Sequence, residues 1–206
     1  MRKLLLPTVL VCLTTAPAFG HAVAALDART WNVDGAHSEV GFKVRHFFTP
    51  ISGSFNDSEI NLAFDSDNPA NSHVEATIAV ASVNTGNERR DDHLRSADWF
   101  EAATYPYITC SSSSVKRLDA TNLVATGTLT IKVVGRKVDL PIKQLGVQAI
   151  PASMRDMLGG ITEAASFQAR LTIDRSDFGV GVGSWAETAV VGGEVQIELL
   201  VEANHQ

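Results

Sequence analysis

Cysteine is almost absent from the chain: Cys12 and Cys110 are the only two in 206 residues. Cys12 lies in an apolar N-terminal run that the mature protein is expected to lose, so no intramolecular disulfide can then form. Stability must therefore come from apolar burial within one domain. Cys110 has no base or positive charge beside it in the sequence, which favours a buried structural thiol over a nucleophile.

Runs of basic residues are missing as well. The formal net charge is −6 at pH 7, and affinity for nucleic acid depends on clustered Lys and Arg that neutralise phosphate. Nucleic acid is therefore excluded as a partner. There is also no G-x-x-x-x-G-K-[ST] nucleotide loop, no G-x-S-x-G nucleophile elbow and no H-E-x-x-H zinc-protease helix. No helix pattern follows the glycines of 178–185, so we expect a turn or bulge there.

The N-terminus has the features of a cleavable secretory signal peptide. A basic start precedes an apolar run over 4–16, and Ala22-Val23-Ala24 matches the small-x-small pattern that a signal peptidase cleaves. The run is too short to span a bilayer comfortably. We expect residues 1–24 to be removed and residues 25–206 to form one domain in the periplasm.

Most of the remaining sequence alternates between apolar and polar residues, which is typical of strands with one buried face. Within 37–48, Val40, Phe42 and Val44 share a face, with His46 closing the row. The same period of two recurs over 60–64, 74–80, 123–133, 167–173 and 195–201. Turn residues separate these runs. The spacing predicts an all-β fold, an antiparallel barrel that is closed or nearly so.

Two segments depart from this alternation. Residues 87–103 are rich in helix formers and predict one or two short helices, with Asp98 and Glu101 as an N-cap pair. Residues 144–162 contain Pro151 and a pair of adjacent glycines, and we expect a long loop or a broken hairpin there.

The histidines do not have the spacing of a metal site. His37 and His46 are nine positions apart and lie on opposite faces of an unbroken strand, so they cannot both approach one ion. We expect no metal and no cofactor. Two interpretations stay open for the charges around His93: a solvated helix face with weak ion pairs, or a buried polar network of Asp91, Asp92 and His93 at a barrel mouth. Composition alone favours the first.

Five segments together carry a resemblance to a known family. They are WNVDGAHSEVGFKVRH (31–46), GSF (53–55), TGNERRDDHLRSADWFEAATYPYI (85–108), IDRSDFGV (173–180) and GGEVQIELLVEA (192–203). In this order they resemble the YceI-like family of secreted polyisoprenoid-binding proteins. The resemblance implies an extended, lipocalin-like barrel whose lumen holds a long amphiphile such as a polyprenyl chain. It implies a binding protein rather than an enzyme.

Small residues occupy many of the positions that we expect to face inward: Ala76, Ala125, Gly127, Ala165 and Ala169. They would either leave room for an alkyl tail, whose burial contributes ~0.8 kcal/mol per methylene, or simply permit tight packing of the sheet. The sequence favours neither explanation over the other.

The expected site combines an apolar lumen with polar contacts at its end. The predicted lumen residues are Val40, Phe42, Val44, His46, Phe55, Trp99, Phe100, Tyr105, Phe167 and Phe178. The predicted head-group contacts are Arg89, Arg90, His93 and Arg175. No residue is assigned a catalytic role, and His46 is placed near the end of the lumen, where a head group or a water needs a partner.

The leading interpretation is a periplasmic binding protein or carrier for a long-chain isoprenoid or similar amphiphilic lipid, with a homodimer left open. The alternative is a periplasmic enzyme that uses His46, His93 and Asp91 or Asp92, with or without a metal. A third hypothesis is an interaction protein whose loop over 144–162 contacts a partner.

Overall fold

The computed structural model describes residues 28–206, so the predicted signal peptide lies outside the described residues. The strands are β1 (Arg29–Val33), β2 (Glu39–His46), β3 (Thr49–Phe55), β4 (Ser58–Phe64), β5 (His73–Ala79), β6 (Val83–Asn84), β7 (Tyr107–Arg117), β8 (Asn122–Ile131), β9 (Val134–Ala149), β10 (Glu163–Asp174) and β11 (Val191–His205). The α-helices are α1 (Glu88–Arg95) and α2 (Ala152–Arg155), and five short 3₁₀ turns lie between strands.

Eight of these strands form a closed antiparallel barrel. The ring runs β1–β4–β5–β7–β8–β9–β10–β11 and closes where β1 pairs with β11. Each strand of the ring is antiparallel to its neighbours, as the hairpin connections require. Closure leaves the ring without a free edge. The predicted all-β barrel with short helices is confirmed.

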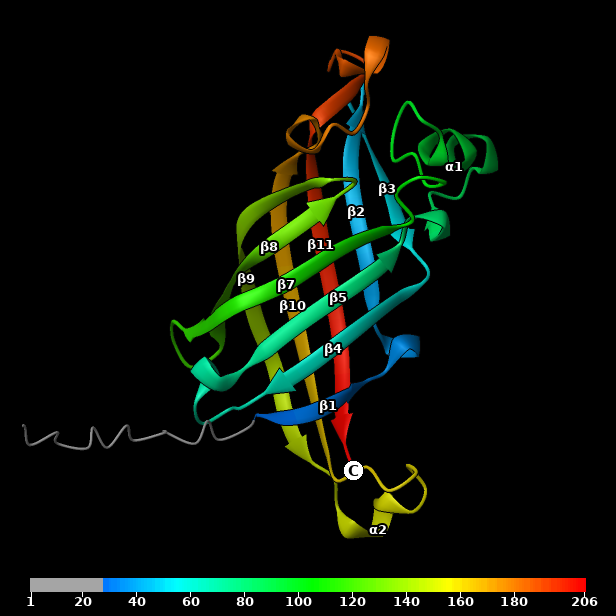
Figure 1. Cartoon of the computed structure of the whole chain (residues 1–206). Helices are drawn as coiled ribbons and strands as arrows, with labels where there is room; N and C mark the ends of the chain where they lie inside the picture. Colours follow the sequence, from blue (N-terminus) through cyan, green and yellow to red (C-terminus); the bar gives the residue numbers. More distant parts are fainter. Residues whose placement is uncertain (1–27) are drawn as a thin grey trace, which may run out of the picture.

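The same sheet continues beyond the closed ring along the long strand β11. Its C-terminal end pairs with β1 through Ala203 and Asn204, whereas its N-terminal part pairs with β2 over 191–200. Beyond β2 lie β3 and β6. The β2–β3 hairpin therefore extends the barrel wall at the end where α1 lies, while α2 lies at the opposite end (Figure 1).

Buried side chains gather in two clusters along the barrel. The first lies toward α1 and contains Val40, Ile78, Val80, Trp99, Ile108, Leu129, Ile131, Phe178 and Val180. The second contains Trp31, Phe64, Val115, Leu123, Ala125, Ala165, Phe167 and Ala203. Most of these residues come from the apolar faces of the strands, where the period of two builds the interior, whereas Trp99, Phe178 and Val180 come from turns.

The predicted helical segment contains a single α-helix, and the predicted cap is wrong. The N-cap residue of α1 is Asn87, whose side chain accepts a hydrogen bond from the Arg90 amide at 3.0 Å. Asp98 instead lies in a series of turns after the helix, where it accepts from His93 Nε2 at 3.1 Å. An Asn at the N-cap satisfies a free helix amide as well as Asp does.

The segment over 144–162 is more regular than the sequence predicts. Strand β9 continues to Ala149, and only residues 150–162, including α2, form the connection to β10. The alternation is hidden because the register shifts opposite Ser166 and Phe167, which leaves Leu145 as an extra residue on β9. The connection exposes Met154 and Met157.

The glycine-rich stretch forms a turn, as predicted. Gly179, Gly181 and Gly183 have φ values of 65°, 79° and 59°, a conformation that side-chain-bearing residues rarely adopt. The chain folds back here between β10 and β11. Among residues 28–206, no helix is both long and apolar enough to cross a membrane.

Candidate ligand-binding site

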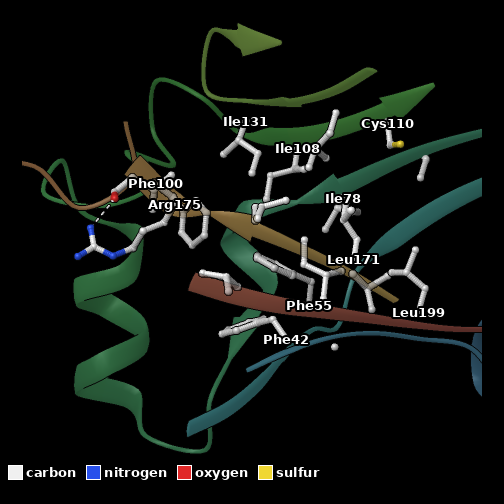
Figure 2. Close-up of a pocket in the computed structure, with 18 of the residues that line it drawn as sticks. Phe42, Phe55, Ile78, Phe100, Ile108, Cys110, Ile131, Leu171, Arg175 and Leu199 are labelled. Atoms are coloured by element: carbon white, nitrogen blue, oxygen red, sulfur yellow. Dashed lines mark hydrogen bonds between the residues drawn. The ribbon is translucent and has the colours of Figure 1, made fainter. Parts of the chain in front are cut away.

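A cavity of about 160 Å³ lies inside the barrel. Its walls are almost entirely aliphatic and aromatic, and they come from β2–β5 and β7–β11 together with α1 and the turns after α1 and β10. Figure 2 shows Phe42, Phe55, Ile78, Ile108, Leu171 and Leu199 converging on this space. An apolar cavity of ~150 Å³ stays dry and can bind a small hydrocarbon, so this space is suited to an apolar group.

A second apolar cavity, of about 110 Å³, continues the first. The two share five wall residues: Ile60, Ala76, Cys110, Leu140 and Leu199. Its walls include Phe64, Leu123 and Phe167 of the second buried cluster. The two cavities are therefore adjacent along the barrel, and the five shared residues border both of them; we refer to the two together as the lumen.

At the other end, the central cavity meets a hollow of about 530 Å³ that we call the mouth. The two share Phe42, Val44, Leu94 and Trp99. The rest of the mouth carries polar and basic groups, namely His46, Thr85, Asn87, Arg89, Arg90 and His93, with Ile51, Trp185 and Val191. The site thus changes from apolar in the lumen to polar at the mouth.

A hydrogen-bond network holds α1 against the mouth. Asp91 is 6% exposed, and its Oδ1 accepts from the Thr85 amide at 2.9 Å and from the Thr85 hydroxyl at 2.5 Å. Arg90 donates through Nε to the Thr85 hydroxyl at 2.7 Å and through Nη2 to the Thr85 carbonyl at 2.8 Å. For Asp91, the buried network is correct and the solvated helix face is wrong. Asp92 is exposed and pairs with Arg95 at 2.7 Å.

Arg175 is buried at the end of the central cavity beside α1 (Figure 2). It is 3% exposed, and its five N–H groups donate to the backbone carbonyls of Val180, Gly181, Trp185, Val191 and Gly192 at 2.6–3.3 Å. Burial lowers the pKa of this guanidinium, and the nearby Asp174 carboxylate opposes that shift. No N–H donor is left for a head group, so the predicted contact is corrected to a structural role.

With this geometry in view, the chain can be compared with known proteins. The sequence model of the YceI-like domain matches residues 31–203. The chain belongs to the YceI-like family.

The relatives agree over most of their length. Protein YceI of Escherichia coli O157:H7 is 37% identical over 164 residues, which cover 78% of this chain and 79% of that protein. The crystal structure of Burkholderia cenocepacia BcnA is 32% identical in sequence and superposes with a TM-score of 0.74, covering 84% of this chain and 99% of that one. A polyisoprenoid binding domain from Saccharophagus degradans is 15% identical with a TM-score of 0.60, covers 87% and 99% of the two chains, and shares the fold.

The YceI-like domain places most of the predicted lumen residues in the cavity walls. Val40, Phe42, Val44, Phe55, Trp99 and Phe100 line the central cavity, Phe167 lines the second cavity, and His46 lines the mouth. Arg89, Arg90 and His93 also line the mouth. Their contacts with a ligand stay predictions.

Two aromatic residues are corrected. Tyr105 is not among the residues that line the two cavities or the mouth, and its ring instead contacts the Lys132 ammonium, with Nζ 5.6 Å from the ring centroid. Phe178 is 2% exposed and packs into the first buried cluster without reaching a cavity. Both residues lie in turns, where the period of two gives no direction for the side chain.

The small inward residues serve different ends at different positions. Ala76 and Ala169 line the cavities and leave space there. Gly127 instead permits close packing, because a Cβ at this position would overlap the Ser111 carbonyl of β7. Ala165 is 1% exposed within the second buried cluster. Both explanations offered by the sequence are thus correct, each at its own positions.

Cys110 is one of the five residues that border both cavities, and Figure 2 shows it on the far side of the lumen from Arg175. Burial raises the pKa of its thiol, which keeps the reactive thiolate scarce at neutral pH. The expectation of a structural thiol agrees with this position.

His37 does not lie on a strand. It ends a 3₁₀ turn before β2, and its Nδ1 is 2.9 Å from Asp34 Oδ2, with Glu202 at 3.9 Å. The hydrogen bond to Asp34 raises the pKa of His37 and lowers that of Asp34. Asp34, His37 and Glu202 form the one group among residues 28–206 whose ligand atoms lie close enough to hold a metal ion; Asp34 and Glu202 are partly buried, His37 is exposed, and the group lies outside the lumen and mouth.

Sequence reasoning missed several wall residues. Leu171, Ile173, Ile197 and Leu199 line the central cavity, and the alternation in 167–173 and 195–201 already placed them on inward faces. Leu94 and Trp185 come from α1 and from a turn, and no strand pattern predicts their position.

Proposed function

We propose that the chain is a periplasmic binding protein or carrier for a long-chain isoprenoid or similar amphiphilic lipid. The observation that carries the proposal is a pair of adjacent apolar cavities inside the barrel, the larger of which meets a polar mouth. This gradient matches a molecule with an oily tail and a polar head. The Saccharophagus degradans domain of the same fold is a polyisoprenoid binding domain, which supports the choice of ligand class.

The energetics favour a long tail. Each buried methylene contributes ~0.8 kcal/mol, and association costs roughly 4–15 kcal/mol in lost freedom. About a dozen methylenes are therefore enough to offset much of that cost. A ligand held mainly by its tail needs no catalytic group, and we propose binding rather than catalysis as the function.

The head group is proposed to contact Arg89, Arg90 and His93 at the mouth. Arg89 is exposed, and Arg90 uses Nε and Nη2 on Thr85 while its Nη1 makes no hydrogen bond within residues 28–206. His93 lies edge-on to the Trp185 ring, with centroids 5.0 Å apart. An oxygen-rich head group would find donors on one side of the mouth and aromatic rings on the other.

The alternative of a His/Asp enzyme has no observation in its favour. Within the described residues, Asp91 is occupied by Thr85 and His93 by Asp98, so the two do not converge on a common point. His46 lines the mouth, and its side chain makes no hydrogen bond within residues 28–206.

Native mass spectrometry tests the binding function. Protein purified from its host without detergent is expected to carry a lipid adduct, and a matched pair of variants locates the adduct. Phe42→Asp places a charge in the lumen and should abolish uptake, whereas Lys43→Asp changes the outer face and should not. A clean apo mass that persists after polyprenyl lipids are added would overturn the proposal. Equal lipid binding by both folded variants would overturn the assignment of the lumen face.

The location is tested separately. N-terminal sequencing of protein recovered from a periplasmic extract is expected to begin at Ala25, whereas an intact Met1 in the cytoplasmic fraction would contradict secretion. A homodimer stays a prediction, which sedimentation equilibrium of the same sample would settle.

A further inference from the structure

The side chain of Trp99 has an unusual position between the lumen and the mouth. It is 5% exposed, and it is one of four residues that line both the central cavity and the mouth. Its indole Nε1–H is buried and has no acceptor among residues 28–206. Buried indole N–H groups usually have a partner, because leaving such a donor unpaired is costly.

The other fully buried tryptophan follows the usual rule. Trp31 is 4% exposed and donates its Nε1–H to the Phe64 carbonyl at 3.1 Å. The unpaired donor is therefore a property of the Trp99 position and not of buried indoles in this barrel.

The charged and polar groups around Trp99 do not accept a hydrogen bond from its indole N–H. The Arg175 guanidinium lies 5.1 Å from the ring and is itself a donor, with all its N–H groups used on carbonyls. His93 approaches edge-on with centroids 6.0 Å apart, and its Nε2 is engaged by Asp98. A buried water typically needs two to four polar partners, and the central cavity next to Trp99 is otherwise apolar.

We propose that Trp99 Nε1–H donates a hydrogen bond to the first oxygen of the ligand, at the boundary between tail and head group. The ligand class is then a prenyl or alkyl chain whose terminal carbon bears an acceptor oxygen, as in an alcohol, an ester or a phosphate ester. A pure hydrocarbon fills the same lumen but leaves the donor unpaired. This inference rests on the proposed lipid-binding function and adds the residue that selects for oxygen.

Two probes separate the inference from the proposed function: geranylgeraniol and its deoxy hydrocarbon, each delivered from cyclodextrin. In the unaltered protein, the indole N–H resonances of its three tryptophans report directly. Geranylgeraniol should shift the Trp99 N–H resonance downfield, and the hydrocarbon should not. The Trp31 resonance is an internal reference because its partner is a backbone carbonyl.

The affinity ratio of the two probes gives the second measurement. The unaltered protein should bind the alcohol about tenfold more tightly than the hydrocarbon, the upper range for one neutral hydrogen bond. Trp99→Phe keeps an aromatic ring and removes the donor, so the ratio should fall close to one. Trp31→Phe removes a buried indole that lines neither cavity nor the mouth, and should keep the ratio.

The outcomes are distinct. Failure of the unaltered protein to bind either probe would overturn the proposed function and this inference with it. Binding of both probes with equal affinity, or an unchanged ratio in Trp99→Phe, would overturn only the role of Trp99. Because the resonance is read in the unaltered protein, a folding defect in the variant does not decide the question.

Discussion

Replacing Arg175 by Met should destabilise the fold far more than replacing an exposed arginine. The substitution keeps much of the apolar stem but removes five hydrogen bonds, and it leaves five carbonyl groups of the 180–192 segment without their donor. A hydrogen bond to a charged group contributes roughly 1.5–3 kcal/mol to stability when it is considered singly. Much of that sum is offset by the cost of burying the cation.

Removing one partner of a buried charged network costs roughly 3–5 kcal/mol, and we expect a loss in that range for Arg175→Met. This is a large fraction of the roughly 5–15 kcal/mol by which domains are stable. The matched control is Arg170→Met, because Arg170 is exposed and pairs with Glu198 at 2.8 Å on the outer surface. Such a surface pair contributes at most ~1 kcal/mol.

Urea unfolding followed by circular dichroism measures both variants. The midpoint should fall strongly for Arg175→Met and little for Arg170→Met, with similar slopes if the same surface is exposed on unfolding. If the two free energies of unfolding lie within ~1 kcal/mol of each other, the hydrogen bonds from Arg175 to the carbonyls do not stabilise the turn more than a surface ion pair would. A stable Arg175→Met variant that had lost lipid binding would instead restore the head-group role.

Three further predictions concern packing, the thiol and pH. Gly127→Ala should lower the free energy of unfolding by about 1–3 kcal/mol because the added methyl overlaps the backbone of β7. Gly146→Ala should not lower it, because its methyl meets open space, and urea unfolding of both variants measures the difference. Alkylation of Cys110, followed by mass spectrometry of its peptide, should be slow at pH 8 because burial raises the thiol pKa, and bound lipid should slow it further; a rate unaffected by lipid would contradict its place in the lumen. In an NMR titration, the pKa of His37 should lie above 6.5 and return toward it in Asp34→Asn. The raised pKa of His37 means that its contribution to stability is lost as the pH rises from 6.5 through that pKa. The lowered pKa of Asp34 means that its contribution is lost as the pH falls from 3.8 through that pKa. Between pH 3.8 and pH 6.5 both contributions are present.

The parts of the site that lie on strands could be predicted from the sequence. Val40, Phe42 and Val44 face the lumen because side chains alternate along β2, and that rule depends only on backbone geometry. The rule loses its register at a bulge. Leu145 on β9 is such an extra residue, and the strand around it was therefore expected to be a loop.

The parts that depend on tertiary contacts could not be predicted. Arg175 satisfies its donors with carbonyls that only the folded turn brings together, so its neighbours in sequence show an exposed cation where the fold buries one. Asp91 is likewise buried by its contacts with Thr85 across a turn, although composition indicated a solvated helix. The missing acceptor of Trp99 is visible only once its whole surroundings are in place.

The five side chains that border both cavities bear on how the affinity for a ligand depends on the length of its tail. Ile60, Ala76, Cys110, Leu140 and Leu199 border both spaces. A short tail that enters through the mouth contacts the walls of the central cavity alone, whereas a longer tail extends past these five side chains into the second cavity. Affinity should therefore increase in two stages as isoprene units are added, one stage for each cavity.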